Sequence, residues 1–208
     1  MRIFVKLFGA LCIALALSAC VKPAEWASDE AITKVQYRDP GPTKLTLFTM
    51  ISNSNGSGAH TSLMINGSQR VAFDPAGSFR HEDIPTRDDV VFGMTPYLTD
   101  VYTRFHARET YHVIVQELDV SPEVAELALQ KALAYGPVSK AHCARSTSDI
   151  LSGLPGFENI RQTYFPKKLS EQFAQYKGVT SERLYEYDDD DKTKVLRAYV
   201  PENKLKKK

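Results

Sequence analysis

The chain has 208 residues, which is enough for one ordinary domain with its own core and too few to favour two. Its 26 lysines and arginines nearly balance its 25 aspartates and glutamates, and 43% of its residues are hydrophobic, as in a globular protein. This balance argues against nucleic-acid binding, because contact with a phosphate backbone needs a concentrated excess of positive charge on one face. Such an excess occurs only in the terminal run KLKKK, which we interpret as a solvated tail.

The first twenty residues, MRIFVKLFGALCIALALSAC, have the order of a secretory signal: basic residues, an apolar run over 7–17, then small residues. The apolar run is short for a membrane-spanning helix. Its end, LSAC, resembles a bacterial lipobox, in which the cysteine is acylated and becomes the first mature residue. We therefore predict a signal peptide over 1–19 and lipidation at Cys20; an ordinary cleaved signal ending near a cysteine is the alternative. Val21 follows, and by resemblance to sorted lipoproteins this favours a periplasm-facing anchor in the outer membrane of a bacterial cell envelope.

The remaining chain is predicted to have three parts. Residues 20–43 form a lipidated N-terminus and tether, residues 44–187 form the domain, and residues 188–208 form a charged C-terminal segment and tail. The acidic run over 188–191 is interpreted as a solvated loop, because it lacks the alternating ligand spacing of a calcium loop.

In chain order, the domain begins with a strand over 44–51 and a flexible loop over 52–58, SNSNGSG. A β-hairpin follows, AHTSLMI and SQRVAFD, with Asn66-Gly67 supplying the turn. A short apolar strand is expected over 90–92. Tyr97, Val101 and Phe105, four residues apart, predict one face of a helix.

The second half alternates strands and helices. A strand is expected over 110–120 and a helix over 121–136, where Ser121 caps the start, Gly136 suits the exit, and the core face is supplied by Val124, Leu127, Ala128 and Leu133. The run from Cys143 to Leu151 predicts a second helix with the cysteine in its first turn. A peripheral helix over 166–176 and late strands over 181–188 and 194–200 complete the prediction.

The cysteine count gives Cys143 its interest. Cys12 leaves with the signal and Cys20 carries the lipid, so the exported chain keeps a single free thiol. In an oxidising compartment an unpaired cysteine indicates intermolecular pairing or reactivity. The alternative is an inert core thiol, because free cysteine packs like a small hydrophobic residue.

A thiol at a helix N-terminus has a stabilised thiolate, because the unpaired N–H groups and the helix dipole favour negative charge there. The same N–H groups can hold the oxyanion of a tetrahedral intermediate. Among the five histidines, His60 is the preferred base because it begins a hairpin strand directly after a glycine-rich loop, at the rim of an expected cleft. His142 adjoins Cys143 and is expected to point elsewhere. A satisfied structural histidine is the alternative for His60.

Asp74 strengthens the assignment of His60. If a three-residue turn makes paired positions of the hairpin sum to 134, Asp74 lies opposite His60, where its carboxylate can fix the imidazole tautomer and support the imidazolium. A two- or four-residue turn pairs His60 with Phe73 or Pro75 instead. The alternative for Asp74 is that it starts the turn DPAG.

Over roughly residues 44–177 the order of elements is a strand, a glycine-rich loop, the strand GAHTSLMI, its return strand, a further strand, a helix, and a helix that begins with a cysteine. This order resembles that of the circularly permuted papain-like (NlpC-type) superfamily. Its permuted branch includes lecithin:retinol acyltransferase and bacterial envelope lipoproteins. The resemblance implies an α+β fold with a small antiparallel sheet packed against helices. It implies Cys143 as nucleophile, His60 as base and Asp74 as the third polar residue. His142 stands where the family usually has Asn, which weakens any transfer of substrate preference.

These patterns predict a cysteine hydrolase or acyltransferase that acts through a thioacyl intermediate on an amide or ester, in peptidoglycan peptides or acyl lipids. No cofactor or metal is implied, because the histidines lack paired ligand spacing. The expected partners are the membrane, through the lipid, and that substrate, with no nucleic acid; the patterns leave the oligomeric state open. The rival hypothesis is an inactive envelope lipoprotein that uses the same fold as a binding module.

Overall fold

The computed structural model describes residues 26–205, so the predicted signal peptide and Cys20 lie outside it. The predicted α+β class is confirmed: helices cover an antiparallel sheet of order β4-β5-β3-β2-β1-β6-β7. The strands are β1 (Lys44–Ser52), β2 (Gly58–Asn66), β3 (Arg70–Phe73), β4 (Thr86–Arg87), β5 (Val90–Val91), β6 (Tyr111–Asp119) and β7 (Thr180–Leu184). The helices are α2 (Asp29–Val35), α3 (Pro96–His106), α4 (Pro122–Ala134), α5 (Cys143–Ser152), α6 (Pro166–Phe173), α7 (Thr193–Ala198) and α8 (Glu202–Leu205).

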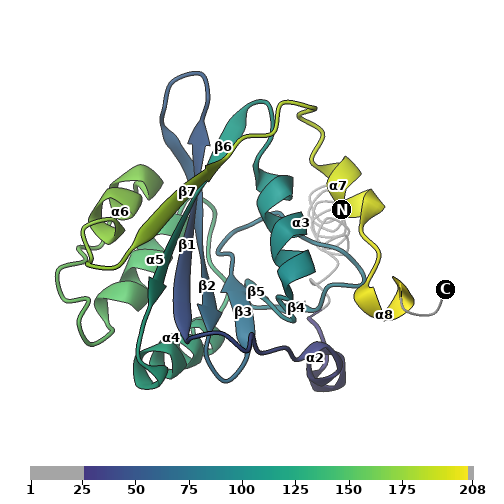
Figure 1. Cartoon of the computed structure of the whole chain (residues 1–208), viewed down its shortest axis with the longest axis horizontal. Coiled ribbons are helices and arrows are strands. Elements are labelled where there is room, and N and C mark those ends of the chain that lie inside the picture. The colour runs from purple at the N-terminus through teal and green to yellow at the C-terminus, as the bar shows by residue number, and fades with distance from the viewer. Residues whose placement is uncertain (1–25, 206–208) are drawn as a thin grey trace, which may run out of the picture.

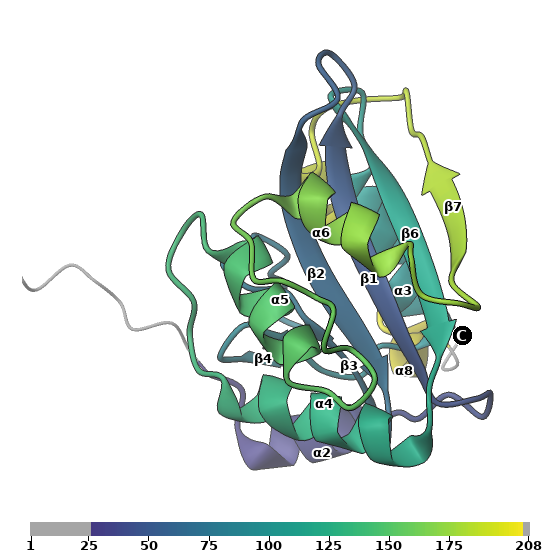
Figure 2. The same ribbon diagram turned by 90° about the vertical axis from the view of Figure 1, so that its left-hand side faces the viewer.

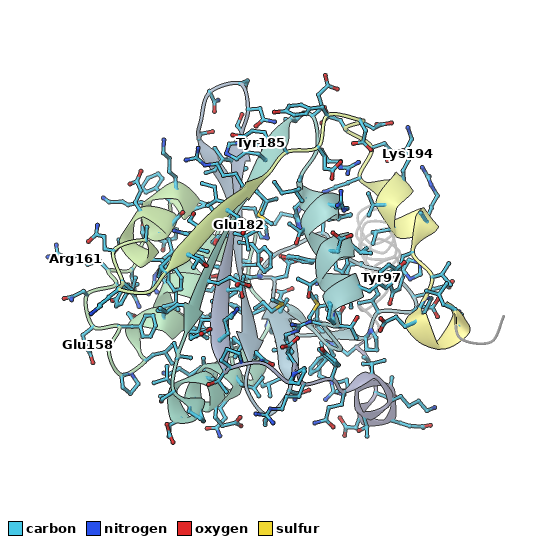
Figure 3. The ribbon with its side chains drawn as sticks, viewed as in Figure 1. Tyr97, Glu158, Arg161, Glu182, Tyr185 and Lys194 are labelled. Carbon is cyan, nitrogen blue, oxygen red and sulfur yellow. The ribbon has the colours of Figure 1, made fainter. Side chains whose placement is uncertain are left out.

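Helices cover both faces of the sheet (Figures 1 and 2). The α4, α5 and α6 helices lie on one face, and α3 and α7 lie on the other. Side chains of the central strand β1 alternate between them, so Leu45 and Leu47 join the core under α4–α6, whereas Phe48 and Met50 join the core under α3. Charged side chains such as Glu158, Arg161 and Lys194 lie at the periphery (Figure 3). Burial on both faces makes β1 the centre of the fold.

The β2–β3 hairpin forms as predicted, but its register differs. Its three-residue turn lies at 67–69, and Asn66 pairs with Arg70, so paired positions sum to 136 rather than 134. The physical reason is that Asn66 is buried in the strand, where its side-chain amide donates to the Pro42 carbonyl (3.0 Å) and accepts from the Asp39 N–H (3.1 Å). Asn66 therefore anchors the N-terminal segment instead of forming the turn.

The α4 helix has the predicted caps. The Ser121 hydroxyl accepts from the Val124 N–H, and Gly136 takes a φ of +79° just past the exit, a conformation that favours glycine. The predicted core face is correct for Ala128, which is fully buried, and wrong for Leu133, which is 39% exposed. Leu129 is the buried leucine of this turn.

Two other element predictions are wrong. Residues 194–200 were expected to form a strand, but α7 occupies Thr193–Ala198. The apolar residues Val195, Leu196 and Tyr199 fall on one helical face and pack against the core under α3, so the helical period fits them better than alternation does. The α6 helix is not peripheral, because Leu169 and Phe173 are fully buried.

The predicted tether and tail both fold against the domain. Ile32 and Val35 of α2, within the predicted tether, pack against the core under α4–α6. At the other end the acidic run, predicted to be a solvated loop, contacts α7 and the segment between α3 and β6, and α7 packs on α3. No helix within residues 26–205 is both long and apolar enough to cross a membrane.

Leu129 and Leu133 provide a matched test of this packing within one helix. We expect Leu129→Ala to lower the free energy of unfolding by about 2–5 kcal/mol, because it leaves a cavity under α4. Leu133→Ala should change it by less than about 1 kcal/mol, since that side chain is largely in solvent. Urea denaturation of both variants measures the difference. Equal losses would contradict the described orientation of α4.

Candidate active site

Cys143 is the first residue of α5, as the sequence predicts. The first backbone hydrogen bond of the helix runs from the Ser146 N–H to the His142 carbonyl (2.9 Å), so the N–H groups of the opening turn are free for other acceptors. Cys143 forms no disulfide within the described residues, and it is only 7% exposed. The thiol therefore combines a helix N-terminus with shelter from solvent.

The sheet meets this thiol at an open edge of β2. The β3 strand pairs with β2 only between Leu63 and Asn66, so the outer edge of β2 before Leu63 is left without a strand partner. In that gap the sulfur of Cys143 accepts hydrogen bonds from the backbone N–H groups of Thr61 and Ala144. Two N–H donors from different elements thus converge on one atom.

His60 and Asp74 are in contact, as predicted, although the predicted register was wrong. His60 Nε2 lies 2.7 Å from Asp74 Oδ1. The observed pairing, continued past β3, places Asp74 opposite Ser62, and His60 is the next residue along β2 on the same face, so the contact is diagonal. The Asp74 carbonyl also accepts from the Gly77 N–H (3.0 Å), so the turn role and the histidine contact coexist.

Asp74 is fully buried and is held from a second side by α3. The Tyr102 hydroxyl donates to Asp74 Oδ1 (2.9 Å) and shares a hydrogen bond of 2.6 Å with Ser62 Oγ. Because Asp74 occupies Nε2, the other ring nitrogen of His60 is left for Cys143, and the two side chains are hydrogen-bonded. The arrangement is a chain of Tyr102, Asp74, His60 and Cys143.

The electrostatics of the chain favour its ionised form. Burial alone would lower the pKa of His60, but the hydrogen bonds and charges of Asp74 and Cys143 outweigh it and raise this pKa to about 10. Burial likewise opposes ionisation of Asp74 and Cys143, yet His60 lowers the pKa of both, with the Thr61 and Ala144 N–H groups aiding the thiol. The contact therefore shifts both groups toward the thiolate–imidazolium form, by lowering the pKa of the thiol and raising that of the imidazole.

His106, at the end of α3, lies beside His60, which the sequence did not indicate. The two rings stack with centroids 5.9 Å apart, and His106 Nδ1 donates to the Tyr102 carbonyl (2.9 Å). Burial lowers the pKa of His106 to about 4, so it is neutral. Within residues 26–205, one group of three or more His, Cys, Asp or Glu side chains has its possible metal-ligand atoms within 4.8 Å of one another. It consists of His60, Asp74 and His106. These donors suit Zn²⁺, but a metal there would compete with the bond between His60 and Asp74.

The other histidines lie away from the thiol chemistry. His142 packs on Tyr164 with ring centroids 5.5 Å apart, consistent with its expected orientation. His112 is 9% exposed and its Nδ1 lies 2.7 Å from Asn53 Oδ1. His81 accepts from the Asp83 N–H.

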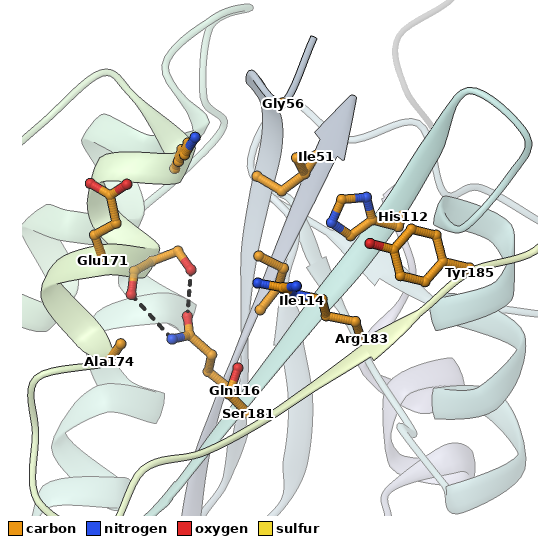
Figure 4. A pocket seen from close by; sticks show the side chains of 12 residues that line it. Ile51, Gly56, His112, Ile114, Gln116, Glu171, Ala174, Ser181, Arg183 and Tyr185 are labelled. Atoms are coloured by element: carbon orange, nitrogen blue, oxygen red, sulfur yellow. Dashed lines mark hydrogen bonds between the residues drawn. The ribbon is translucent and has the colours of Figure 1, made fainter. Parts of the chain in front are cut away.

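Of two cavities near the sheet, one is lined by residues of the site and the other is not. A cavity of about 210 Å³ has His60 and His106 in its wall. Another, of about 370 Å³, lies between α6 and β6–β7, with a floor formed by the hydrogen-bonded pair Gln116 and Ser170 (Figure 4). Neither Cys143 nor His60 lines that second cavity. The smaller cavity is therefore the one that adjoins the chain of ionisable groups.

Comparisons of the chain with protein-family models, with curated proteins and with solved structures gave no significant match. The resemblance to the permuted papain-like superfamily therefore stays a prediction.

The ionised pair predicts a specific pH dependence of thiol reactivity. The alkylation rate of Cys143 should rise with pH through a midpoint below the ordinary thiol value, because the imidazolium lowers the pKa of the thiol. His60→Gln removes that cation, so its midpoint should move upward. His142→Gln is the matched control and should leave the midpoint in place. The midpoint is measured from the rate of iodoacetamide alkylation, followed by mass spectrometry, at a series of pH values. Coincident profiles for His60→Gln and the unsubstituted protein would refute the ion pair between Cys143 and His60.

Gly77 predicts a steric test of the same chain. A Cβ at this position would lie 1.8 Å from Asp74 Oδ2, so Gly77→Ala must displace the carboxylate from His60. We expect the alkylation midpoint of Cys143 to rise as in His60→Gln, together with a lower melting temperature. Gly153→Ala is the control, because its Cβ would meet only the mobile end of Lys131 (2.8 Å). An unchanged midpoint in Gly77→Ala would show that Asp74 does not set the charge of His60.

Proposed function

We propose that this protein is a cysteine hydrolase or acyltransferase of the permuted papain-like kind, acting on an amide or ester bond. The observation that carries the proposal is the hydrogen-bonded chain of Asp74, His60 and Cys143, in which a buried carboxylate orients a histidine beside a thiol at a helix N-terminus. Nucleophile, base and orienting group in mutual contact are the signature of nucleophilic acyl transfer.

In the first step the Cys143 thiolate attacks the carbonyl carbon of the substrate. A C–S bond forms, and the carbonyl π electrons move to the oxygen, whose charge would be stabilised by hydrogen bonds donated by the N–H groups of Thr61 and Ala144 once the sulfur has lost its own charge. His60 then donates its proton to the leaving nitrogen or oxygen as that bond breaks. A thioester and the released amine or alcohol result.

In the second step His60, now neutral, removes a proton from water or from another acceptor hydroxyl or amine. The acceptor attacks the thioester carbonyl, and collapse of the tetrahedral intermediate breaks the C–S bond. Cys143 leaves as thiolate and His60 is again the imidazolium held by Asp74. Water as acceptor gives hydrolysis, and another acceptor gives acyl transfer.

The chain order supports the family proposal. His60 precedes Cys143 in the sequence, on a strand after a glycine-rich loop, as in the permuted branch. The signal-like N-terminus with Cys20 supports a lipid-anchored protein facing the periplasm, with peptidoglycan peptides or acyl lipids as substrates within reach. The low exposure of Cys143, 7%, favours the second candidate, an inactive binding module with a packed thiol.

The deciding experiment compares substrate classes with matched variants. Peptidoglycan fragments and acyl lipids are incubated with the protein and with Cys143→Ala, His60→Ala and His142→Ala, and products and acyl-enzyme are followed by mass spectrometry. We expect turnover and a thioester on Cys143; turnover should fall by about three orders of magnitude or more in Cys143→Ala and His60→Ala, and Cys143→Ala should form no acyl-enzyme at all. His142→Ala should retain activity. Absence of any acyl-enzyme, with a thiol that labels only after unfolding, would favour the binding module.

A further inference from the structure

The acidic run after β7 holds the C-terminal segment against the site. Each of its four carboxylates has a partner, so none is left as an open cation ligand among the described residues. Two of the contacts reach the α3–β6 corner and two stay within the segment. They are Asp188 to Arg108 (3.2 Å), Asp190 to the Thr110 N–H (2.7 Å), Asp189 to Lys194, and Asp191 to Arg197 (3.0 Å).

These contacts hold the segment so that Lys192 lines the cavity beside His60. Lys192 Nζ lies 2.7 Å from Ser78 Oγ and 5.1 Å from the centre of the Phe105 ring. Both partners are neutral, and the neighbouring carboxylates are bound elsewhere. The ammonium group therefore keeps its full charge available to a ligand, while the aromatic ring fixes its position.

The wall of the cavity is largely apolar, with a lysine among its few polar groups. The cavity measures about 210 Å³, and Ser78, Tyr111 and Lys192 supply hydrogen-bond donors to its wall. Among the described residues, none that lines it is acidic. Asp74 does not line the cavity: its Oδ1 contacts His60 and accepts from Tyr102, while its Oδ2, without a hydrogen-bond partner within residues 26–205, lies behind the lining residue Gly77.

The position of the cavity relative to Cys143 indicates which part of a substrate it would hold. His60 lines the cavity, whereas Cys143 does not. In the proposed mechanism His60 must reach the leaving atom to protonate it, so the leaving group departs along the side of His60. The cavity therefore receives the leaving group rather than the acyl chain.

We infer that Lys192 and Ser78 bind an anionic group, a carboxylate or a phosphate ester, on the leaving group of the substrate. This inference rests on the proposed function for the orientation of the substrate, and on the cavity alone for the binding of the anion. The acceptable substrates are then acyl amino acids or peptides cleaved next to a free carboxylate, or acyl esters of a phosphorylated alcohol. Neutral leaving groups of the same size are disfavoured.

The test measures binding to the Cys143→Ala protein, which cannot turn substrate over. One set of probes is a mixture of N-acetyl dipeptides with free carboxylates, another is the same mixture with amidated ends, and a third is glycerol 3-phosphate. Calorimetry should show at least one anionic probe binding about tenfold or more tightly than its neutral counterpart, glycerol in the case of the phosphate. Whichever anion binds identifies the group.

Variants separate charge from folding. Lys192→Met and Ser78→Ala should weaken the anionic probe, Lys192→Met by about tenfold or more, while Lys192→Arg retains it. Lys177→Met, at an exposed lysine distant in sequence, is the matched control and should bind as the parent does. Equal affinity for anionic and neutral probes, no binding of any probe at millimolar concentration, or no effect of Lys192→Met would each overturn the inference.

The two hypotheses fail separately. Thiol alkylation of the unsubstituted protein reports on the proposed chemistry and does not require Lys192. Anion binding that depends on Lys192 together with an unreactive Cys143 would refute the hydrolase and leave the anion site standing. A reactive Cys143 with no preference for anionic probes would refute the anion site and leave the proposed hydrolase standing.

Discussion

The hydrogen bond between His60 and Asp74 is the interaction on which the site depends. It joins a carboxylate with no solvent exposure to an imidazole that is itself largely covered, and a buried charge is stable only when paired and hydrogen-bonded. Tyr102 supplies a further donor from α3, so one helix, two strands and their turn are tied together at Asp74. The same bond fixes which ring nitrogen of His60 faces the thiol, so it both stabilises the fold and orients the imidazole.

The short length of β3 shapes the site, because it leaves part of the outer edge of β2 without a strand partner in the described part of the chain. Because β3 is only four residues long, β2 continues beyond it with an open edge, and an open edge presents backbone donors that require partners. The start of α5 fills this edge with the sulfur of Cys143. One N–H donor of the open strand edge and one of the uncapped helix start are thereby satisfied by the same acceptor, the sulfur of Cys143.

Local patterns in the sequence were sufficient for the parts of the site that lie within single elements. The hairpin with His60 and the helix opened by Cys143 both follow from turn residues and periodicity. Asp74 was predicted from a register that proved two positions off in its pair sum, and the prediction survived because an even shift keeps a residue on the same face of a sheet. Tyr102, His106 and Lys192 could not be found this way, because their approach to His60 depends on how α3 and the C-terminal segment pack, which no spacing in the chain encodes.

The hairpin also separates two events in time. His60 and Asp74 are fourteen residues apart and belong to one locally formed unit, whereas Cys143 joins them only when α5 docks on the sheet. Contacts between residues close in sequence form sooner than those between distant ones, because the entropy lost on closing the loop is smaller. Until α5 docks, the Cys143 thiol lacks the contact with His60 that lowers its pKa, so the thiol of the folded chain is more acidic than that of the unfolded chain.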